Sequence, residues 1–151
     1  MGRTARGVIG IRLRPGDYIV EMAVTREFGT ILTVTENGFG KRTAIDQYRL
    51  QGRGGSGIIN LKVTKRNGPV AGMMRVDEDD QLIVITQMGM IIRMNLEDIK
   101  VIGRSTQGVK VINTKEGDKV VAVARLVERD PDLASENSEE DDGQEELPGT
   151  E

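Results

Sequence analysis

The stretch ILTVTENGFGKRTAIDQYRLQGR (residues 31–53) is repeated as LIVITQMGMIIRMNLEDIKVIGR (residues 82–104) at a constant offset of 51 positions. Identical or chemically similar residues occupy matching places in the two copies, as Arg42 and Arg93 do. Agreement over so many positions indicates a structural unit that is built more than once along the chain. The fold is therefore expected to be an array of repeats with a period of about 50 residues.

A second set of similar stretches marks where each unit begins. The sequences GRTARGVIGIRL (2–13), GRGGSGIINLKV (52–63) and GRSTQGVKVINT (103–114) each start with Gly-Arg and carry a second glycine five positions after the first. Their starts are 50 and 51 residues apart, in step with the longer repeat. The third unit ends after its first two expected strands, so residues 1–127 are predicted to hold about two and a half repeats.

The pattern within each unit is typical of β-strands. Short, β-branched, alternating runs such as TILTVT (30–35) and KRTAI (41–45) are separated by turn sequences rich in Asn, Asp, Gly and Pro. Runs at 7–13 and 18–24 are expected to be strands for the same reason, and LEDI (96–99) is expected to form no more than one helical turn. The chain is predicted to be all-β, a propeller-like array of four-stranded antiparallel blades.

Charge divides the chain into two regions. Residues 1–127 contain 20 Lys and Arg against 13 Asp and Glu, whereas residues 128–151 contain 11 acidic residues and one arginine. The second region has almost nothing apolar and is expected to be a disordered acidic tail. A basic body joined to an acidic tail often marks a protein that handles nucleic acid. Two roles fit the tail: a solubilising terminus, or a mimic of phosphate that competes with DNA for the basic body.

Composition excludes several classes of chemistry. The chain has no Cys and no His, so disulfides, thiol catalysis, His-based acid–base catalysis and zinc sites are excluded. The acidic run DEDD (77–80) is expected to be a solvated hairpin turn, because the ligands of a hard cation must converge at fixed spacing. No glycine-rich nucleotide motif precedes a helix, and no apolar run has the length of a membrane span. The region is expected to be non-catalytic and cytoplasmic, with no metal, no cofactor and no membrane partner.

In all three units, the arginine that follows the first glycine holds the same position of the repeat. Equivalent positions of a blade array lie on the same rim, so Arg3, Arg53 and Arg104 are expected to form a spaced line of charge. The glycines beside them let a phosphate backbone approach and expose peptide N–H groups. Four scattered aromatic residues form no stacking platform for single strands, so duplex DNA held through its phosphates is the expected partner. The predicted DNA-binding cations are Arg3, Arg6, Arg12, Lys41, Arg42, Arg49, Arg53, Lys62, Arg93 and Arg104.

Several separated stretches resemble one known family. The sequences MGRTARGVIGIRL (1–13), TENGFGKRTAIDQY (35–48), LKVTKRNGPVAG (61–72) and VIGRSTQGVKVI (101–112) are similar to the C-terminal domain of the DNA gyrase A protein. The resemblance implies the last blades of a six-bladed β-pinwheel, whose basic rim wraps duplex DNA and so supports ATP-dependent negative supercoiling. It also implies, as partners, the gyrase B protein and the rest of the gyrase A protein, in an A2B2 complex near the bacterial nucleoid. ATP and magnesium would belong to the whole enzyme, and neither Tyr18 nor Tyr48 is expected to be the catalytic tyrosine.

Residues 51–57 resemble a degenerate copy of that family's signature wrapping loop, which reads Gln, basic, Arg, Gly, Gly, basic, Gly. The residues that match are Gln51, Arg53, Gly54, Gly55 and Gly57, and the departures are Gly52 and Ser56 in place of the two basic residues. Weaker contact with DNA than in the signature loop is expected.

Two alternatives stay open at this point. The A-type protein of topoisomerase IV has a related, shorter pinwheel, and the weak signature loop here separates the two families imperfectly. A propeller-like scaffold for protein interactions, whose rim charges only solubilise it, is the alternative from another class. Phosphate binding should weaken steeply as salt rises, whereas docking through an apolar patch should not.

Overall fold

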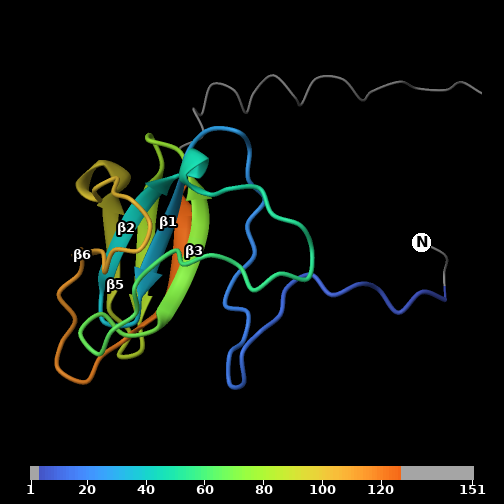
Figure 1. The fold of residues 1–151 in the computed structure, drawn as a ribbon. Helices are drawn as coiled ribbons and strands as arrows, with labels where there is room; N and C mark the ends of the chain where they lie inside the picture. Colours follow the sequence, from blue (N-terminus) through green and yellow to red (C-terminus); the bar gives the residue numbers. More distant parts are fainter. Residues whose placement is uncertain (1–3, 127–151) are drawn as a thin grey trace, which may run out of the picture.

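The computed structural model describes residues 4–126, which form two antiparallel sheets and two single-turn 3-10 helices (Figure 1). Arg3 and the acidic region 128–151 lie outside the described residues. The elements, in chain order, are β1 (Thr30–Thr35), β2 (Phe39–Ala44), η1 (Ile45–Gln47), β3 (Val70–Val76), β4 (Gln81–Thr86), β5 (Ile91–Asn95), η2 (Leu96–Asp98), β6 (Val109–Lys110) and β7 (Val120–Leu126). The all-β class is confirmed, and so is the single turn of helix at 96–98.

The first sheet joins strands from three consecutive units. β1 and β2 form a hairpin, β3 pairs with the other side of β1, and the short β6 pairs with β2, in the order β3-β1-β2-β6. Since β3 belongs to the second unit and β6 to the third, later units complete the sheet of an earlier one. This sheet is a four-stranded antiparallel blade of the kind that the sequence predicts.

The second sheet repeats the first, one unit later along the chain. β4 and β5 form its hairpin and β7 pairs with β4, in the order β5-β4-β7. A register shift interrupts the pairing at the same repeat position in both sheets, between Val34 and Thr35 and between Ile85 and Thr86. The internal repeat of the sequence is therefore also a repeat of backbone geometry.

Two expected strands, at 7–13 and 18–24, do not form. Residues 4–28 run outside the sheets (Figure 1). Ile11 makes a single bridge with Gly55. Residues 19–25 hold the repeat position of β7, which pairs with β4 of the preceding unit. In the described part of the chain, no strand equivalent to β1 or β4 lies before residue 19. Residues 19–25 therefore have the alternating apolar and polar residues of a strand but no strand to pair with.

The hydrophobic core lies where the two sheets face each other. Leu32 and Val34 of the first sheet are fully buried, as are Leu82 and Val84 of the second. Leu96 and Ile99, in and just after η2, complete the cluster and are also fully buried. The apolar face of each hairpin therefore packs on its neighbour, which is how a repeat that cannot bury its own face becomes stable.

Candidate nucleic-acid interface

The second glycine of each Gly-Arg frame has the same backbone conformation. Gly7, Gly57 and Gly108 have φ angles of +85°, +77° and +76°. An L-residue with a side chain adopts this left-handed region only at an energetic cost, so glycine is the favoured residue there. The recurrence of the glycine in the sequence thus reflects one turn geometry, built three times.

The second and third Gly-Arg loops are each hydrogen-bonded to the segment that follows the preceding loop. In the first such contact, the Gly54 N–H donates to the Gly10 carbonyl at 2.8 Å and the Arg12 N–H donates to the Gly55 carbonyl at 2.8 Å. The next unit repeats it: Ser105 donates to Asn60 at 3.1 Å and Lys62 to Thr106 at 2.8 Å. The loops at 52–57 and 103–108 therefore occupy equivalent places on the array.

The predicted cations divide into three groups. Arg6, Arg49, Arg53 and Lys62 are exposed and have no hydrogen bond or ion pair from the side chain within residues 4–126. The exposed Arg12 donates from Nε to the Gly54 carbonyl at 2.9 Å, the half-buried Arg104 donates to the Ile59 carbonyl at 3.1 Å, and the exposed Arg93 donates to Gln81. The third group, Lys41 and Arg42, is buried.

Lys41 and Arg42 do not lie on the exposed rim where their sequence pattern predicts them. The Lys41 side chain has no exposed surface, and its ammonium donates to the Asn60 carbonyl at 2.6 Å and to the Gly103 carbonyl at 2.9 Å. Arg42 donates from Nε to the Ile99 carbonyl at 2.8 Å. The cause is the segment 99–103, which runs alongside β2 and covers it.

Arg42 and Arg93 hold the same repeat position but differ in burial, because the segment 99–103 lies beside β2 only. Arg42 forms a parallel β-bridge with Val101, whose segment runs beside β2. Arg93 holds the same position in β5 but is exposed, since no equivalent segment lies over β5 within the described residues. Buried cations that donate to backbone carbonyls join units together and do not reach a ligand in solution.

Lys41 provides a test of this structural role. Burial lowers the pKa of the Lys41 ammonium, and the nearby Arg104 charge lowers it further below the ordinary value of 10.5. Between the folded and unfolded pKa values the unfolded chain binds more protons, so folding gains stability from this group as pH rises through that window. We expect Lys41→Met to lower the free energy of unfolding by about 1–2 kcal/mol at neutral pH. The difference in free energy of unfolding between this variant and the parent chain should grow toward about pH 10. Urea unfolding at both pH values measures it.

The exposed Lys65→Met variant is the matched control for that experiment. It removes the same ammonium from a turn where the side chain has no partner within residues 4–126. The structural role of Lys41 would be contradicted if the difference in free energy of unfolding between the parent and Lys41→Met became smaller as pH rises. It would also be contradicted if Lys41→Met and Lys65→Met lowered that free energy equally.

Two exposed cations that the sequence pattern did not single out lie against the Phe39 ring, and a third is next to one of them in sequence. The Arg66 guanidinium and the Lys110 ammonium each lie 5.1 Å from the ring centroid. Lys65 is exposed beside Arg66. The stretch RNGP (66–69) is one of the turn sequences rich in Asn, Gly and Pro, and its sequence does not show that three units meet there.

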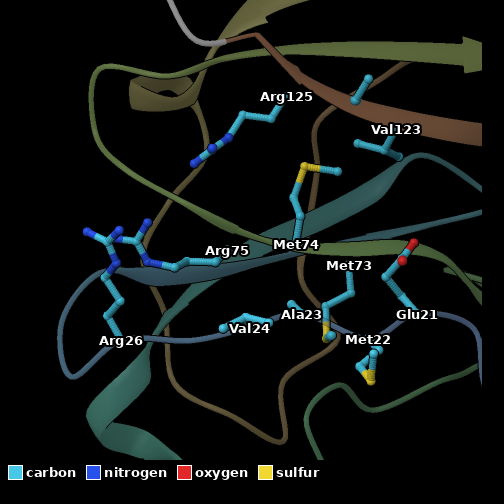
Figure 2. A pocket seen from close by; sticks show the side chains of 11 residues that line it. Glu21, Met22, Ala23, Val24, Arg26, Met73, Met74, Arg75, Val123 and Arg125 are labelled. Atoms are coloured by element: carbon cyan, nitrogen blue, oxygen red, sulfur yellow. The ribbon is translucent and has the colours of Figure 1, made fainter.

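A cavity of about 560 Å³ opens between residues 21–26 and the strands β3 and β7 (Figure 2). Methionines line one part of it, and Arg26, Arg75 and Arg125 extend together on the other side (Figure 2). Arg75 forms a bidentate ion pair with Asp77 at 2.7 and 2.9 Å, and Arg125 lies 3.2 Å from Asp80. These ion pairs compensate the charges of Arg75 and Arg125.

Two other kinds of site are absent from residues 4–126. No group of three or more Asp and Glu side chains there could hold a metal ion. No helix in the same part of the chain is long and apolar enough to cross a membrane.

Comparisons with known proteins place this geometry in one family. The family described as DNA gyrase C-terminal domain, beta-propeller, matches residues 1–26, 29–77 and 80–126. The chain belongs to this family. It is 48% identical to the DNA gyrase A protein of Salmonella typhimurium and 46% identical to that of Escherichia coli, each over 128 residues. Both matches cover 85% of this chain and 15% of the gyrase A protein, so the chain spans a small part of these relatives.

Solved structures share the fold of this gyrase C-terminal domain. A structure of a DNA gyrase A C-terminal domain superposes with a TM-score of 0.74 at 28% identity, covering 81% of this chain and 42% of that one. The C-terminal domain of a DNA topoisomerase IV superposes with a TM-score of 0.73 at 25% identity, covering 80% and 38%. The two scores are close, so the fold alone does not separate the two enzymes, whereas the curated relatives named above are gyrase A proteins.

Proposed function

We propose that this gyrase C-terminal region binds duplex DNA through its phosphates and supports DNA wrapping by the gyrase A protein. In a whole A2B2 gyrase this would contribute to ATP-dependent negative supercoiling, with ATP and magnesium bound elsewhere in the enzyme. The region itself would supply charge and shape and would perform no chemical step. Its partners would be duplex DNA, the gyrase B protein and the rest of the gyrase A protein.

The observation that carries this proposal is that consecutive Gly-Arg loops are held on the array by equivalent backbone hydrogen bonds. Arg53 is exposed on one loop, with Gly52 and Gly54 on either side of it in sequence. Arg12 and Arg104 instead donate to carbonyls at the loop contacts, at 2.9 and 3.1 Å. Phosphate contacts need spaced cations and glycine-bordered backbone that a polyanion can approach. Of the two arginines of the Gly-Arg series that the structure describes, Arg53 and Arg104, Arg53 therefore has the greater freedom to reach a phosphate.

Replacing Arg53 tests the loop directly. We expect Arg53→Gln to weaken binding of a duplex of about 40 base pairs by roughly tenfold near 0.1 M salt, and to reduce the slope of log K against log salt by about one. Arg53→Lys should keep the slope, because it keeps the charge. Fluorescence anisotropy titrations of the whole 151-residue chain between about 50 and 200 mM salt provide the measurement. No binding by the folded parent chain at low salt would overturn the proposed function, and binding that ignores salt would favour a protein-interaction scaffold.

The acidic region 128–151 is proposed to modulate this binding as a tethered competitor for the cations. It follows directly on β7, which ends at Leu126, so its local concentration at the array would be high. Tighter DNA binding by residues 1–127 than by the whole chain, with a difference that shrinks as salt rises, is the expected result. Equal binding by both would leave the tail a solubilising role.

A further inference from the structure

The two ends of the sheets carry different charge. β1 and β4 run from the end where η1, η2 and the 77–80 turn lie toward the end where their hairpins turn back. The two 3-10 helices mark the first end, at the top of Figure 1. We call it the acidic end and define it by residues 45–47, 77–80 and 96–98. The opposite end, which we call the basic end, consists of residues 36–38, 64–69, 110 and 113–119.

The acidic end holds seven carboxylates and no cation within its three segments. Arg75 and Arg125 pair with Asp77 and Asp80 from the neighbouring strands. The other five carboxylates have no cationic partner within residues 4–126 and are all exposed: Asp46, Glu78, Asp79, Glu97 and Asp98. A polyanion that approached this end would meet uncompensated negative charge.

The basic end holds five cations, all exposed, against three carboxylates. The cations are Lys65, Arg66, Lys110, Lys115 and Lys119, and the carboxylates are Glu36, Glu116 and Asp118. Lys119 lies 3.1 Å from Glu36 and neutralises it. The carboxylate of Asp118 is buried and accepts from the N–H groups of Met88 and Lys119. The charge that remains accessible at this end is mainly positive.

Contacts among three units hold the backbone of Lys65 and Arg66 and the side chain of Lys110. Asn37 of the first unit donates from its side-chain amide to the carbonyls of Lys65 and Arg66, at 3.3 and 3.1 Å. Lys110 of the third unit donates to the Asn37 carbonyl at 2.9 Å. The charged groups of Arg66 and Lys110 both lie near the Phe39 ring, which is almost fully buried. This Phe39 cluster (Lys65, Arg66 and Lys110) therefore presents its cations from a fixed base.

Packing beneath the cluster keeps the turn that carries it in place. The buried Asn67 side chain accepts from the Thr64 N–H at 2.7 Å and donates to the carbonyls of Lys62 and Gln107 at 3.0 Å each. Ordering of a side chain on binding is unfavourable. Arg66 and Lys110, whose charged groups already lie against Phe39, therefore bind phosphate at a smaller entropic cost than free side chains do.

We propose that duplex DNA crosses the basic end of the array, with its phosphates on the Phe39 cluster, and that the acidic end faces away from it. This inference rests on the proposed function and adds to it a second contact site, distinct from the Gly-Arg loops, and a direction for the bound duplex. The ligand is the phosphate backbone, so the contact carries no base specificity.

A pair of charge-neutralising variants at the two ends tests the direction. We expect Lys65→Gln combined with Arg66→Gln to weaken binding of the same duplex by roughly tenfold for each lost contact near 0.1 M salt, and to lower the salt slope by about two. Lys100→Gln, two residues after η2 and also exposed, removes a cation just outside the three segments of the acidic end and should change neither quantity. Equal effects of Lys65→Gln and Lys100→Gln, each alone, would overturn the proposed direction.

Energy transfer gives a second readout that removes no cation. The chain has no cysteine, so a dye attached through Asn113→Cys reports on the basic end and one attached through Gln47→Cys reports on the acidic end; both positions are exposed. With an acceptor at the centre of the duplex, transfer should be more efficient from position 113 than from position 47. Suppose instead that transfer is more efficient from position 47 than from position 113, while the parent chain binds DNA and Arg53→Gln binds it more weakly. That result would refute the proposed direction and leave the proposed function intact. A folded parent chain that does not bind would refute both.

Discussion

The Leu82→Ala variant is expected to unfold with a free energy about 3 kcal/mol lower than that of the parent chain. Leu82 is fully buried in the central strand β4, opposite Met94 of β5 and Arg125 of β7. Removing its side chain takes apolar surface out of the core cluster and leaves a cavity between the two sheets, and Leu-to-Ala changes of this kind lose about 2–5 kcal/mol. Because a domain is typically stable by only about 5–15 kcal/mol, the loss is a large share of the total.

Urea unfolding followed by far-ultraviolet circular dichroism measures that loss, since the chain has no tryptophan to report by fluorescence. The matched control is Leu50→Ala, because the Leu50 side chain is 101% exposed. A surface change of this type should shift stability by no more than about 0.5 kcal/mol. If the two variants lost the same stability, the placement of the core between the two sheets would be wrong.

The second large effect is expected from Gly38→Ala, at the turn between β1 and β2. Gly38 has a φ of +77°, and a Cβ atom added there would lie 2.5 Å from the Ile112 carbonyl oxygen. The Gly38 carbonyl also accepts from the N–H groups of Val111 and Ile112, at 3.0 and 3.1 Å. A methyl group must therefore push the third unit away from the first, in addition to the strain of a left-handed backbone. We expect a loss of about 3 kcal/mol from these two effects together.

The repeat supplies the control for this prediction. Gly89 holds the same position one unit later, with a φ of +83°, and an added Cβ there would meet nothing within 4 Å. Gly89→Ala should therefore show the backbone strain alone, about 1–2 kcal/mol. Urea unfolding of the two variants separates the effects, and equal losses would show that the close approach of Ile112 to Gly38 contributes nothing to stability.

Local sequence predicted the elements whose partners are close along the chain. The run TILTVT at 30–35 forms β1, and the hairpin to β2 follows at the expected turn. The runs at 7–13 and 18–24 have the same alternation but form no strand. Alternation shows that a segment can present one apolar face, and it says nothing of whether a neighbouring strand is available to pair with it.

The candidate interface was predictable to a similar extent. The repeated Gly-Arg frames predicted where the loops lie, and Arg53 is exposed on one of them. Lys41 gave the same sequence signal as an exposed cation, yet it donates to two carbonyls that lie 19 and 62 residues away along the chain. The Phe39 cluster was missed for the same reason, because Arg66 and Lys110 meet at one ring from different units.

The sequence by itself determined the repeat, the all-β class, the loop positions and the family, because each depends on residues near one another or on a pattern repeated along the chain. Only the tertiary structure decided which strands find partners, which cations are buried between units, and which end of the array is positive. Burial, ion pairing and accumulated charge depend on contacts between residues far apart in the chain, and the fold alone brings those residues together.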